Sequence, residues 1–445
     1  MAVRERWNSS LTFMLAAVGS AVGLGNIWKF PYITGVNGGG MFVLIYLACI
    51  ACVGVPLLMC EMFIGARGQA NAVKAFENIH RPGSPWRWLG RLALIAVFLI
   101  LSFYGVIGGW ILDFLQMAVR GQFVHNDPQA IRSLLEQLQA NPVRQVIWLL
   151  IYMALNAAVM AGGFKKGLER ANVWLMPALV VVLLLLLVRV LFLPGIGHAL
   201  TFLFWPDSSR LTPVGVIEAV GHSFFTLSIA VAIHMTYSSH LSDTQSLGRS
   251  ALIIALFDTL IALMAGVIIF SITFSFGLEA GVGPTLIFQT LPVLFAGMNG
   301  GWFVSVLFFL LVAFAALTSS LSICEALVCY STETWGIGRK KAAWGLGAVA
   351  FAAGLASALS TNVLSTWTLW GKTPFDLLDW VTSSLFLPAG GIGMALFVGW
   401  VLGPPAVQAL LGERLARSIW GWIFLWTIRV FAPAAVGAVW LRALW

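Results

Sequence analysis

The chain has 445 residues, of which 60% are hydrophobic and only 9% are charged. A soluble domain of this length does not carry so little charge, so composition excludes a soluble globular protein and predicts an all-α polytopic membrane protein. The net charge of +8 fits basic cytoplasmic loops better than a nucleic-acid partner, and we expect no nucleic acid to bind.

The hydrophobic pattern predicts eleven membrane spans. In chain order they cover 10–34, 41–66, 89–119, 143–162, 170–191, 213–240, 250–276, 302–333, 342–358, 376–401 and 418–441. Amphipathic segments near 126–140 and 284–297 belong to loops. Lys and Arg are more than twice as frequent in the segments on the side of the N-terminus. We therefore expect the N-terminus in the cytoplasm and the C-terminus outside. The first span is too long and too rich in glycine for a cleavable signal peptide.

The first span is weakened by Gly19, Gly23 and Gly25, and Asn26 and Lys29 follow. The glycines alone fit either a close helix-packing motif or an interrupted helix. An interrupted helix must line a polar cavity or be buried in protein, because its freed backbone groups cannot face lipid. Freed carbonyls attract cations, and helix N-termini attract carboxylates.

A second polar interruption, at Thr226 and Ser228, lies in the sixth span. The first and sixth spans begin two successive sets of five, and five is odd, so the second set enters the membrane from the opposite side. This pattern predicts a single transporter domain over 1–445, with inverted repeats at about 8–191 and 211–402 and an additional helix at about 417–442. Matching interruptions in two inverted halves indicate a transporter binding site.

Further polar side chains lie in other spans. Asp258, in span 7, is a carboxylate at membrane depth and a candidate functional group, unless it is a protonated acid bonded to a backbone carbonyl. Glu61, in span 2, fits a structural role in supporting a broken helix. The hydroxyl run 318–322, in span 8, fits either bonds to its own helix or an oxygen site for a monovalent cation.

The isolated Cys49-Ile-Ala-Cys52 has no neighbouring histidine, so packing is favoured over metal or redox use. Neither a P-loop nor an HExxH motif is present, and we do not expect an enzyme. A channel is the main rival to a transporter, but no selectivity-filter repeat occurs.

Lys29 and Asp379 could form an ionic gate, although Asp376 and Asp379 could also be exposed loop carboxylates.

Five motifs occur in a specific order: "GSAVGLGNIWKFP", "NGGG", "FFTLS", "GPTLIFQTLP" and "LTSS". With them, the chain resembles the neurotransmitter:sodium symporter family over essentially its whole length. It resembles the eleven-span bacterial amino-acid transporters rather than the twelve-span members. The resemblance implies the LeuT fold, with a 5+5 inverted repeat, broken helices 1 and 6, and one extra C-terminal helix. It also implies sodium-coupled symport by alternating access.

The resemblance further implies two sodium ions bound at the broken helices. The ligands of the first ion would come from Ala21, Asn26, Thr226 and Asp258, together with the substrate carboxylate. The ligands of the second would come from Gly19, Val22, Ala315, Thr318 and Ser319.

The implied substrate is an amino acid. Its carboxylate would meet the amides of Leu24 and Gly25 and the hydroxyl of Tyr104. Its ammonium would meet carbonyls of Ala21, Phe225 and Thr226, and Ser228. Its side chain would be surrounded by Ser20, Ile100, Phe225, Val231, Ser320 and Ile323. No pocket residue is charged, which favours neutral, hydrophobic amino acids.

The resemblance places an outer gate at Lys29 and Asp379 and an inner gate at Arg4, Trp7 and Glu333. Lys29 stands where relatives usually have Arg, and it cannot form a bidentate fork. His240 replaces a frequent Tyr at the inner gate.

Asp258 and Ala262 differ from the Asn and Ser of chloride-dependent members, and His222 replaces a common Gln, whereas Tyr46 remains. We therefore expect chloride-independent transport, with possible proton uptake by Asp258 on the return step.

The expected partners are an amino acid, sodium ions and the lipid bilayer, with the protein a monomer or loose dimer in a bacterial inner membrane. The alternatives are a symporter of another small carboxylated amine, and a sodium-dependent amino-acid sensor or substrate-gated channel on the same scaffold.

Overall fold

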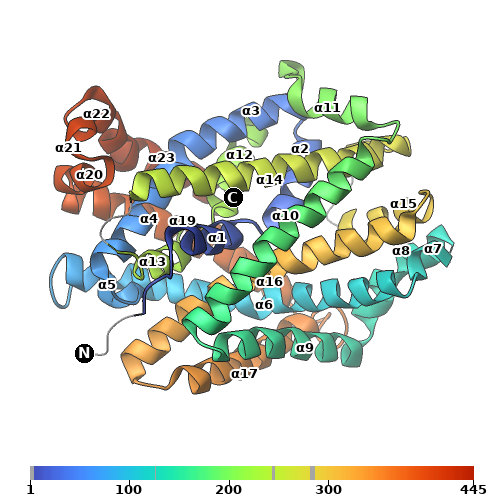
Figure 1. Cartoon of the computed structure of the whole chain (residues 1–445), viewed down its shortest axis with the longest axis horizontal. Coiled ribbons are helices and arrows are strands. Elements are labelled where there is room, and N and C mark those ends of the chain that lie inside the picture. Colours follow the sequence, from blue (N-terminus) through green and yellow to red (C-terminus); the bar gives the residue numbers. More distant parts are fainter. Residues whose placement is uncertain (1–4, 126, 243–245, 281–285, 445) are drawn as a thin grey trace.

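The computed structural model describes residues 5–125, 127–242, 246–280 and 286–444, which form helices, turns and one isolated bridge between Leu369 and Lys372. Most of the long helices run along the longest axis of the molecule (Figure 1). The described residues include nine helices long and apolar enough to cross a membrane, or ten when the bent pair Ser10–Ala21 and Gly25–Val36 is counted as one span. The predicted sixth span is a broken helix outside this count.

The continuous spans are single helices or helices joined through short π-helical segments. They are α3 (Gly40–Cys49), η2 (Ile50–Gly54) and α4 (Val55–Gly68); α6 (Arg87–Val119); α9 (Pro142–Ala161); η3 (Phe164–Glu169) and α10 (Arg170–Val190); α14 (Leu247–Ser275); α16 (Gly301–Trp335); α17 (Arg339–Ala358); α18 (Pro374–Trp380), η6 (Val381–Phe386), α19 (Leu387–Leu396) and η7 (Phe397–Leu402); and α22 (Ile419–Trp426), η8 (Thr427–Phe431) and α23 (Ala432–Leu444). The predicted boundaries agree within a few residues, except that span 5 begins earlier, with η3.

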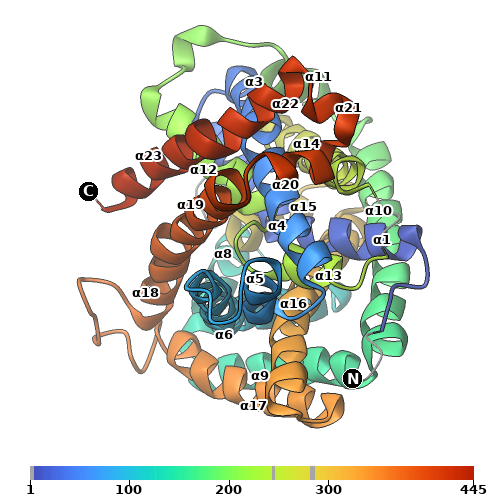
Figure 2. The ribbon, with the colours of Figure 1, turned by 90° about the vertical axis from the view of Figure 1, so that its left-hand side faces the viewer.

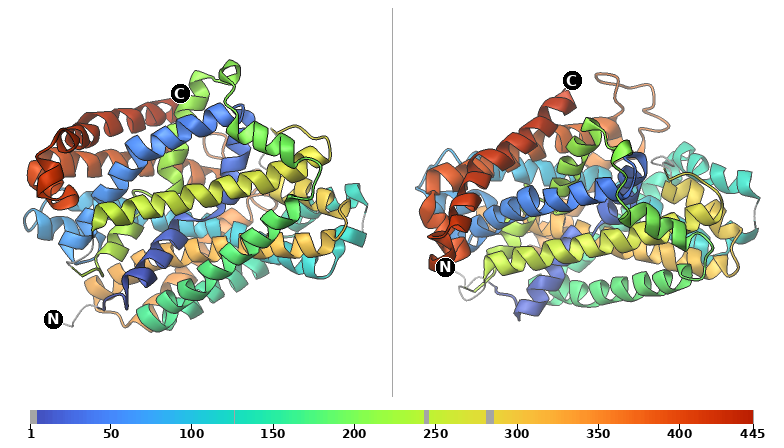
Figure 3. Two further views of the ribbon diagram at one scale, coloured as in Figure 1. Left: turned by 45° about the horizontal axis from the view of Figure 1, so that its top comes forward. Right: turned by 90° about the horizontal axis from the view of Figure 1, so that it is seen from above.

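Shorter helices gather at the two ends of the bundle. Helices α7 (Gln122–His125), α8 (Pro128–Ala140) and α15 (Leu291–Ala296) lie at one end, and α5 (Ala72–Ile79), α20 (Pro404–Leu411) and α21 (Glu413–Ala416) lie at the other (Figures 1 and 3). Helix α11 (Ile196–Phe204) and the short segments η4 (Ser208–Arg210) and η5 (Leu286–Thr290) complete the connections. Residues 283–285 of the motif "GPTLIFQTLP" lie outside the described residues.

The first span is interrupted, which is one of the two alternatives that the glycines left open and the one that the family resemblance implied. Helix α1 (Ser10–Ala21) ends before the break, and the chain continues at an angle of 49° through η1 (Gly25–Lys29) and α2 (Phe30–Val36). The gap covers residues 22–24, at the C-terminal side of the glycine-rich stretch. The Asn26 side-chain oxygen accepts the Gly23 amide at 2.9 Å, so one of the amides that the break frees has a partner.

The sixth span is interrupted more widely, between α12 (Pro213–Thr226) and α13 (Ile233–Ser238). Three non-glycine residues of the gap, Ser228, Ala230 and Ala232, have positive φ angles of 50°, 67° and 58°. Each such angle costs about 1 kcal/mol or more, so tertiary contacts must hold this segment.

Helix α4 provides one of those contacts at Gly65. A Cβ added at Gly65 would lie 1.9 Å from the Met235 carbonyl oxygen, so only glycine lets the backbones of α4 and α13 approach this closely. This approach places the short half-helix against a complete span.

Burial distinguishes the centre of the bundle from its edge. In the most apolar 18-residue stretch of α16, 78% of the residues are buried, whereas in that of the last span only 17% are buried. Figure 2 looks along the bundle and shows α4, α13 and α16 near the middle, with α9 and α17 on one side and α22 and α23 on another. The broken helices therefore meet the most enclosed spans.

Candidate functional site

A buried polar cluster joins the two interrupted spans to α14. The Asn26 amide nitrogen donates to Asp258 Oδ1 at 2.6 Å, to the Asp258 carbonyl at 3.0 Å and to Thr226 Oγ1 at 3.3 Å. The Thr226 hydroxyl lies 3.2 and 3.1 Å from the two Asp258 carboxylate oxygens. The structure therefore brings together three of the four residues predicted for the first sodium site. Ala21, the fourth, ends α1.

Asp258 is buried and forms no ion pair with any basic side chain in the described part of the chain. A carboxylate in such a place needs either a proton or a cation. Asn26 directs its nitrogen toward the carboxylate and its oxygen toward Gly23, whereas the sodium-ligand prediction requires its oxygen. The amide must turn over if Asn26 is to bind a cation directly.

A second cluster lies between α16 and the end of α1. The Ser319 hydroxyl is 3.4 Å from both the Ser20 and the Val22 carbonyl oxygens. The neighbouring Thr318 hydroxyl instead bonds within its own helix, to the carbonyls of Phe314 and Ala315 at 3.0 and 3.1 Å. Thr318 therefore bonds to its own helix, as one of the two alternatives predicts, and the cation site at Ser319 stays a prediction. Gly19, the remaining residue predicted for this site, is buried in α1.

Several residues predicted to bind substrate meet at the end of α1. The Ser20 carbonyl, which is close to Ser319, also accepts the Ser228 hydroxyl at 3.0 Å. A Cβ added at Gly25 would lie 3.5 Å from the Phe225 ring, so Phe225 covers the start of η1, next to Leu24. The Tyr104 hydroxyl is buried and has no hydrogen-bond partner among the described residues. It is therefore a donor available to a ligand.

Three other predicted lining residues come from separate elements. Ile100 is half-buried in α6, Val231 is buried in the break of the sixth span, and Ile323 is buried in α16. Their place in a common pocket stays a prediction.

Ser320 belongs to a hydrogen-bond network with α9 that the sequence did not reveal. The Tyr152 hydroxyl lies 2.9 Å from both the Ala316 carbonyl oxygen and the Ser320 hydroxyl, and the Ser320 hydroxyl lies 2.7 Å from Asn156 Oδ1. The Asn156 side-chain nitrogen donates to the Tyr152 carbonyl at 2.9 Å. The only sequence signal is a pair of polar side chains four residues apart in an apolar span, which places them on one helix face.

Glu61 supports the interrupted sixth span, as its pattern predicts. Its Oε2 accepts the Ala230 amide at 2.8 Å, and the His234 ring lies 2.9 Å from the Leu227 carbonyl. One amide and one carbonyl freed by the break therefore find side-chain partners inside the protein, as backbone polar groups in a bilayer require.

The residues predicted for the outer gate do not form an ion pair. Lys29 and Asp379, both in the described part of the chain, lie further apart than an ion pair allows, and Asp379 is exposed. The Lys29 ammonium lies 4.1 Å from the centre of the Phe225 ring, a cation–π contact. The Lys29 ammonium therefore packs on the Phe225 ring, which itself lies against the start of η1.

The residues predicted for the inner gate lie in separate contacts. The Trp7 indole donates to the Tyr237 carbonyl at 2.9 Å, which ties the N-terminal segment to α13. Glu333 accepts the Asn71 backbone amide at 2.7 Å and its side-chain amide at 3.1 Å. Arg4 lies outside the described residues.

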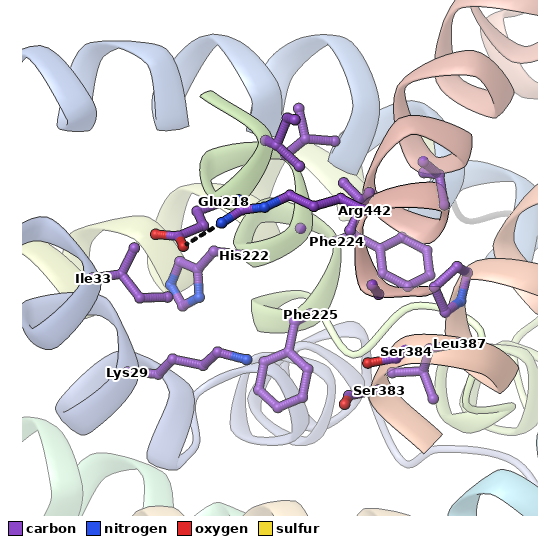
Figure 4. Close-up of a pocket in the computed structure, with 17 residues that line it drawn as sticks. Lys29, Ile33, Glu218, His222, Phe224, Phe225, Ser383, Ser384, Leu387 and Arg442 are labelled. Atoms are coloured by element: carbon purple, nitrogen blue, oxygen red, sulfur yellow. Dashed lines mark hydrogen bonds and ion pairs between the residues drawn. The ribbon is translucent and has the colours of Figure 1, made fainter. Parts of the chain in front are cut away.

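A cavity of about 300 Å³ lies beside Phe225 and Lys29, between α12, α19 and the last helix (Figure 4). Arg442 reaches into it and lies 3.4 Å from Glu218, whose other oxygen accepts the Asn37 side-chain amide at 2.7 Å. The sequence did not single out Glu218 or Arg442, because both stand at ends of predicted spans. Phe225 borders both this cavity and the η1 cluster, so it separates the two.

Comparison with known proteins identifies the family of the chain. The profile described as the sodium:neurotransmitter symporter family matches residues 4–129 and 130–444. The chain belongs to this family. It is 38% identical to the sodium-dependent transporter YhdH of Bacillus subtilis, over 99% of this chain and 97% of that protein. It is 32% identical to a sodium-dependent transporter of Haemophilus influenzae, over 94% of each chain.

Solved structures support the same assignment. The crystal structure of MhsT in complex with L-phenylalanine is similar with a TM-score of 0.89 and 42% identity, and the match covers 99% of this chain and 100% of that chain. The LeuT fold implied by the sequence motifs is thereby confirmed. This symporter-family member is a sodium-dependent multi-pass membrane transporter, not an enzyme.

Proposed function

We propose that this transporter is a sodium-coupled symporter of neutral, hydrophobic amino acids that works by alternating access. The observation that carries the proposal is Asp258, a buried carboxylate without a basic partner among the described residues, set between the two interrupted helices. A sodium ion there, sharing a ligand with the substrate carboxylate, would make the binding of sodium and of amino acid mutually dependent.

The substrate class follows from the side chains and from one relative. The predicted lining residues, from Ser20 in α1 to Ile323 in α16, carry no charge, and MhsT has been crystallised with L-phenylalanine. The Tyr104 hydroxyl, buried and without a partner among the described residues, supplies a donor for the substrate carboxylate.

Two sodium sites fit the two clusters. The first uses Ala21, Asn26, Thr226 and Asp258, and the second uses Gly19, Val22, Ala315, Thr318 and Ser319. All of these donors are oxygens, which suit a hard cation. Asp258 supplies the negative charge that chloride supplies elsewhere in the family, so transport is chloride-independent, and the carboxylate takes up a proton on the return step. We place the protein in a bacterial inner membrane as a monomer or loose dimer, with the N-terminus inside.

The decisive experiment measures L-phenylalanine binding by the purified chain in sodium and in potassium, with L-glutamate as the charged control. We expect binding in sodium only, no binding of glutamate, and sodium-driven uptake into proteoliposomes that persists when gluconate replaces chloride. Sodium-dependent binding without uptake would identify a sensor. Collapse of uptake in gluconate would refute chloride independence, and a failure of every neutral amino acid to bind would refute the proposal.

Gly23 offers a test of the second sodium site. A Cβ added there would lie 2.6 Å from Ser319 Oγ, so Gly23→Ala must displace that hydroxyl from the carbonyls of the break. We expect the sodium concentration for half-maximal amino-acid binding to rise about tenfold, the effect of losing roughly one favourable hydrogen-bonding group. Gly345→Ala, which meets open space in α17, is the matched control. An unchanged sodium requirement in Gly23→Ala would remove Ser319 from the ligand set.

A further inference from the structure

Arg429 is a charged residue in the last predicted span, within η8. Its Nε donates to the Gly399 carbonyl at 2.8 Å, and it forms no ion pair with a carboxylate in the described part of the chain. This span is the least buried of those that cross the bundle unbroken. A cation without a counter-charge on a surface that faces lipid is costly unless something compensates it.

Tryptophan rings surround this guanidinium. Its central carbon lies 4.7 Å from the centre of the Trp400 ring and 5.8 Å from that of Trp426. The ring of Trp422 lies next to that of Trp426, with centroids 6.1 Å apart and the planes tilted by 54°. Trp400 is 54% exposed, and its indole donates to the Arg429 carbonyl at 3.2 Å. Exposed tryptophans of this kind collect at the boundary between hydrocarbon and headgroups.

The position of η7 agrees with that boundary. Arg429 bonds to Gly399 in η7, and η7 ends at Leu402, where the tenth span also ends. Gly399 lies three residues before that end, so the guanidinium is within about one helical turn of the end of the tenth span, although Arg429 is the eleventh residue of the last span, Ile419–Ala443. Helices α20, α21 and α22 pack together at the same end of the molecule (Figure 1).

The arginine is held in place, unlike a side chain that only extends into water. A Cβ added at Gly399 would lie 3.0 Å from Arg429 Cγ, so this glycine makes room for the stem, and the guanidinium Nη2 passes close to Gly403. Nε is bonded to the backbone, and the rings flank the planar group. Its remaining N–H donors have no acceptor among the described residues, and their fork geometry matches phosphate.

We propose that Arg429, with Trp400 and Trp426, binds the phosphate of an anionic phospholipid at this edge of the membrane. The charge of the guanidinium selects the headgroup, and the tryptophans contact the glycerol region and the upper acyl chains. The lipid stabilises the least buried span of the transporter against the bundle. This inference is independent of the proposed substrate.

The test uses the full chain purified in detergent and native mass spectrometry of the lipid that it retains. Phosphatidylglycerol and phosphatidylcholine with the same acyl chains are offered at equal concentrations. We expect phosphatidylglycerol to be retained preferentially, and Arg429→Gln to weaken its retention about fivefold, the effect of one basic group at an anionic membrane surface. Trp400→Leu, which keeps the charge, should also weaken it.

Arg189→Gln is the matched control, because Arg189 also donates to a single backbone carbonyl, that of Asn299 at 2.7 Å, but no ring is stacked on it among the described contacts. Its retention of phosphatidylglycerol should equal that of the unaltered chain. Thermal unfolding in detergent shows that each variant is folded. Equal retention of both lipids, an unchanged Arg429→Gln, or an equal loss in Arg189→Gln would each overturn the proposal.

Discussion

Asp258→Asn is expected to lower sodium-dependent amino-acid binding by about 100-fold or more. The substitution keeps the size of the side chain and an oxygen that can accept the Thr226 hydroxyl, but it removes the only full charge of the cluster. Removal of one partner from a buried charged pair costs on the order of 3 kcal/mol. Sodium titrations of L-phenylalanine binding would measure the loss.

The control for this substitution is Asp379→Asn, because Asp379 is exposed and makes no ion pair with Lys29. It should leave the sodium requirement close to that of the unaltered chain. If Asp258 stands in for chloride, added chloride should restore part of the binding of Asp258→Asn. A wild-type sodium requirement in that variant would show that Asp258 is a structural acid and not a charge for the cation.

Glu61→Leu is expected to destabilise the transporter by about 2–3 kcal/mol and to abolish amino-acid binding. The apolar side chain leaves the Ala230 amide without its acceptor, and a buried donor without a partner costs about 1–3 kcal/mol. The same contact holds a segment in which three residues have positive φ. Loss of the contact should therefore release the break as well as one hydrogen bond.

Glu61→Gln is the matched variant, since its side-chain oxygen can still accept the amide. Thermal unfolding in detergent, together with L-phenylalanine binding, separates the two substitutions. We expect Glu61→Gln to keep most of the stability that Glu61→Leu loses. Equal unfolding temperatures for the two variants would show that the bond to Ala230 does not support the break.

Much of the fold could be predicted from the sequence, because apolar length and glycine placement are local signals. Gly19, Gly23 and Gly25 left the interruption of the first span open, and the polar residues of the other spans favoured it; the structure places the break at 22–24. The interruption of the sixth span was less visible. Ser228, Ala230 and Ala232 adopt positive φ without being glycine, and no local pattern announces a conformation that a distant carboxylate stabilises.

Site residues could be predicted where their residue type is rare in membrane spans. A carboxylate in an apolar span, Asp258 or Glu61, is conspicuous for this reason, and both have the buried polar contacts that their positions led us to expect. Tyr152 and Asn156 were not predictable, because tyrosine and asparagine are tolerated at many span positions. Their importance arises only from the Ser320 hydroxyl on another helix.

The direction of the Lys29 side chain could not be predicted from the sequence. Asp379 in span 10 was expected to pair with Lys29 as an outer gate, which stays a prediction, and in the structure the Lys29 ammonium lies over the Phe225 ring. Side-chain direction decides between a carboxylate and a ring, and it depends on helix rotation, which apolar periodicity leaves open to within a residue or two.

The contact between α4 and the sixth span has a consequence for how the chain enters the membrane during synthesis. Helix α4 leaves the ribosome long before Ala230 is made, so the Glu61 carboxylate waits without the amide that it accepts in the finished protein. Helix α13 is only six residues long, too short to insert as a span by itself. Neither segment reaches its final state alone. The bond that supports the break can therefore form only after the sixth span has been made, so this part of the fold is completed late, by a helix from the first half of the chain.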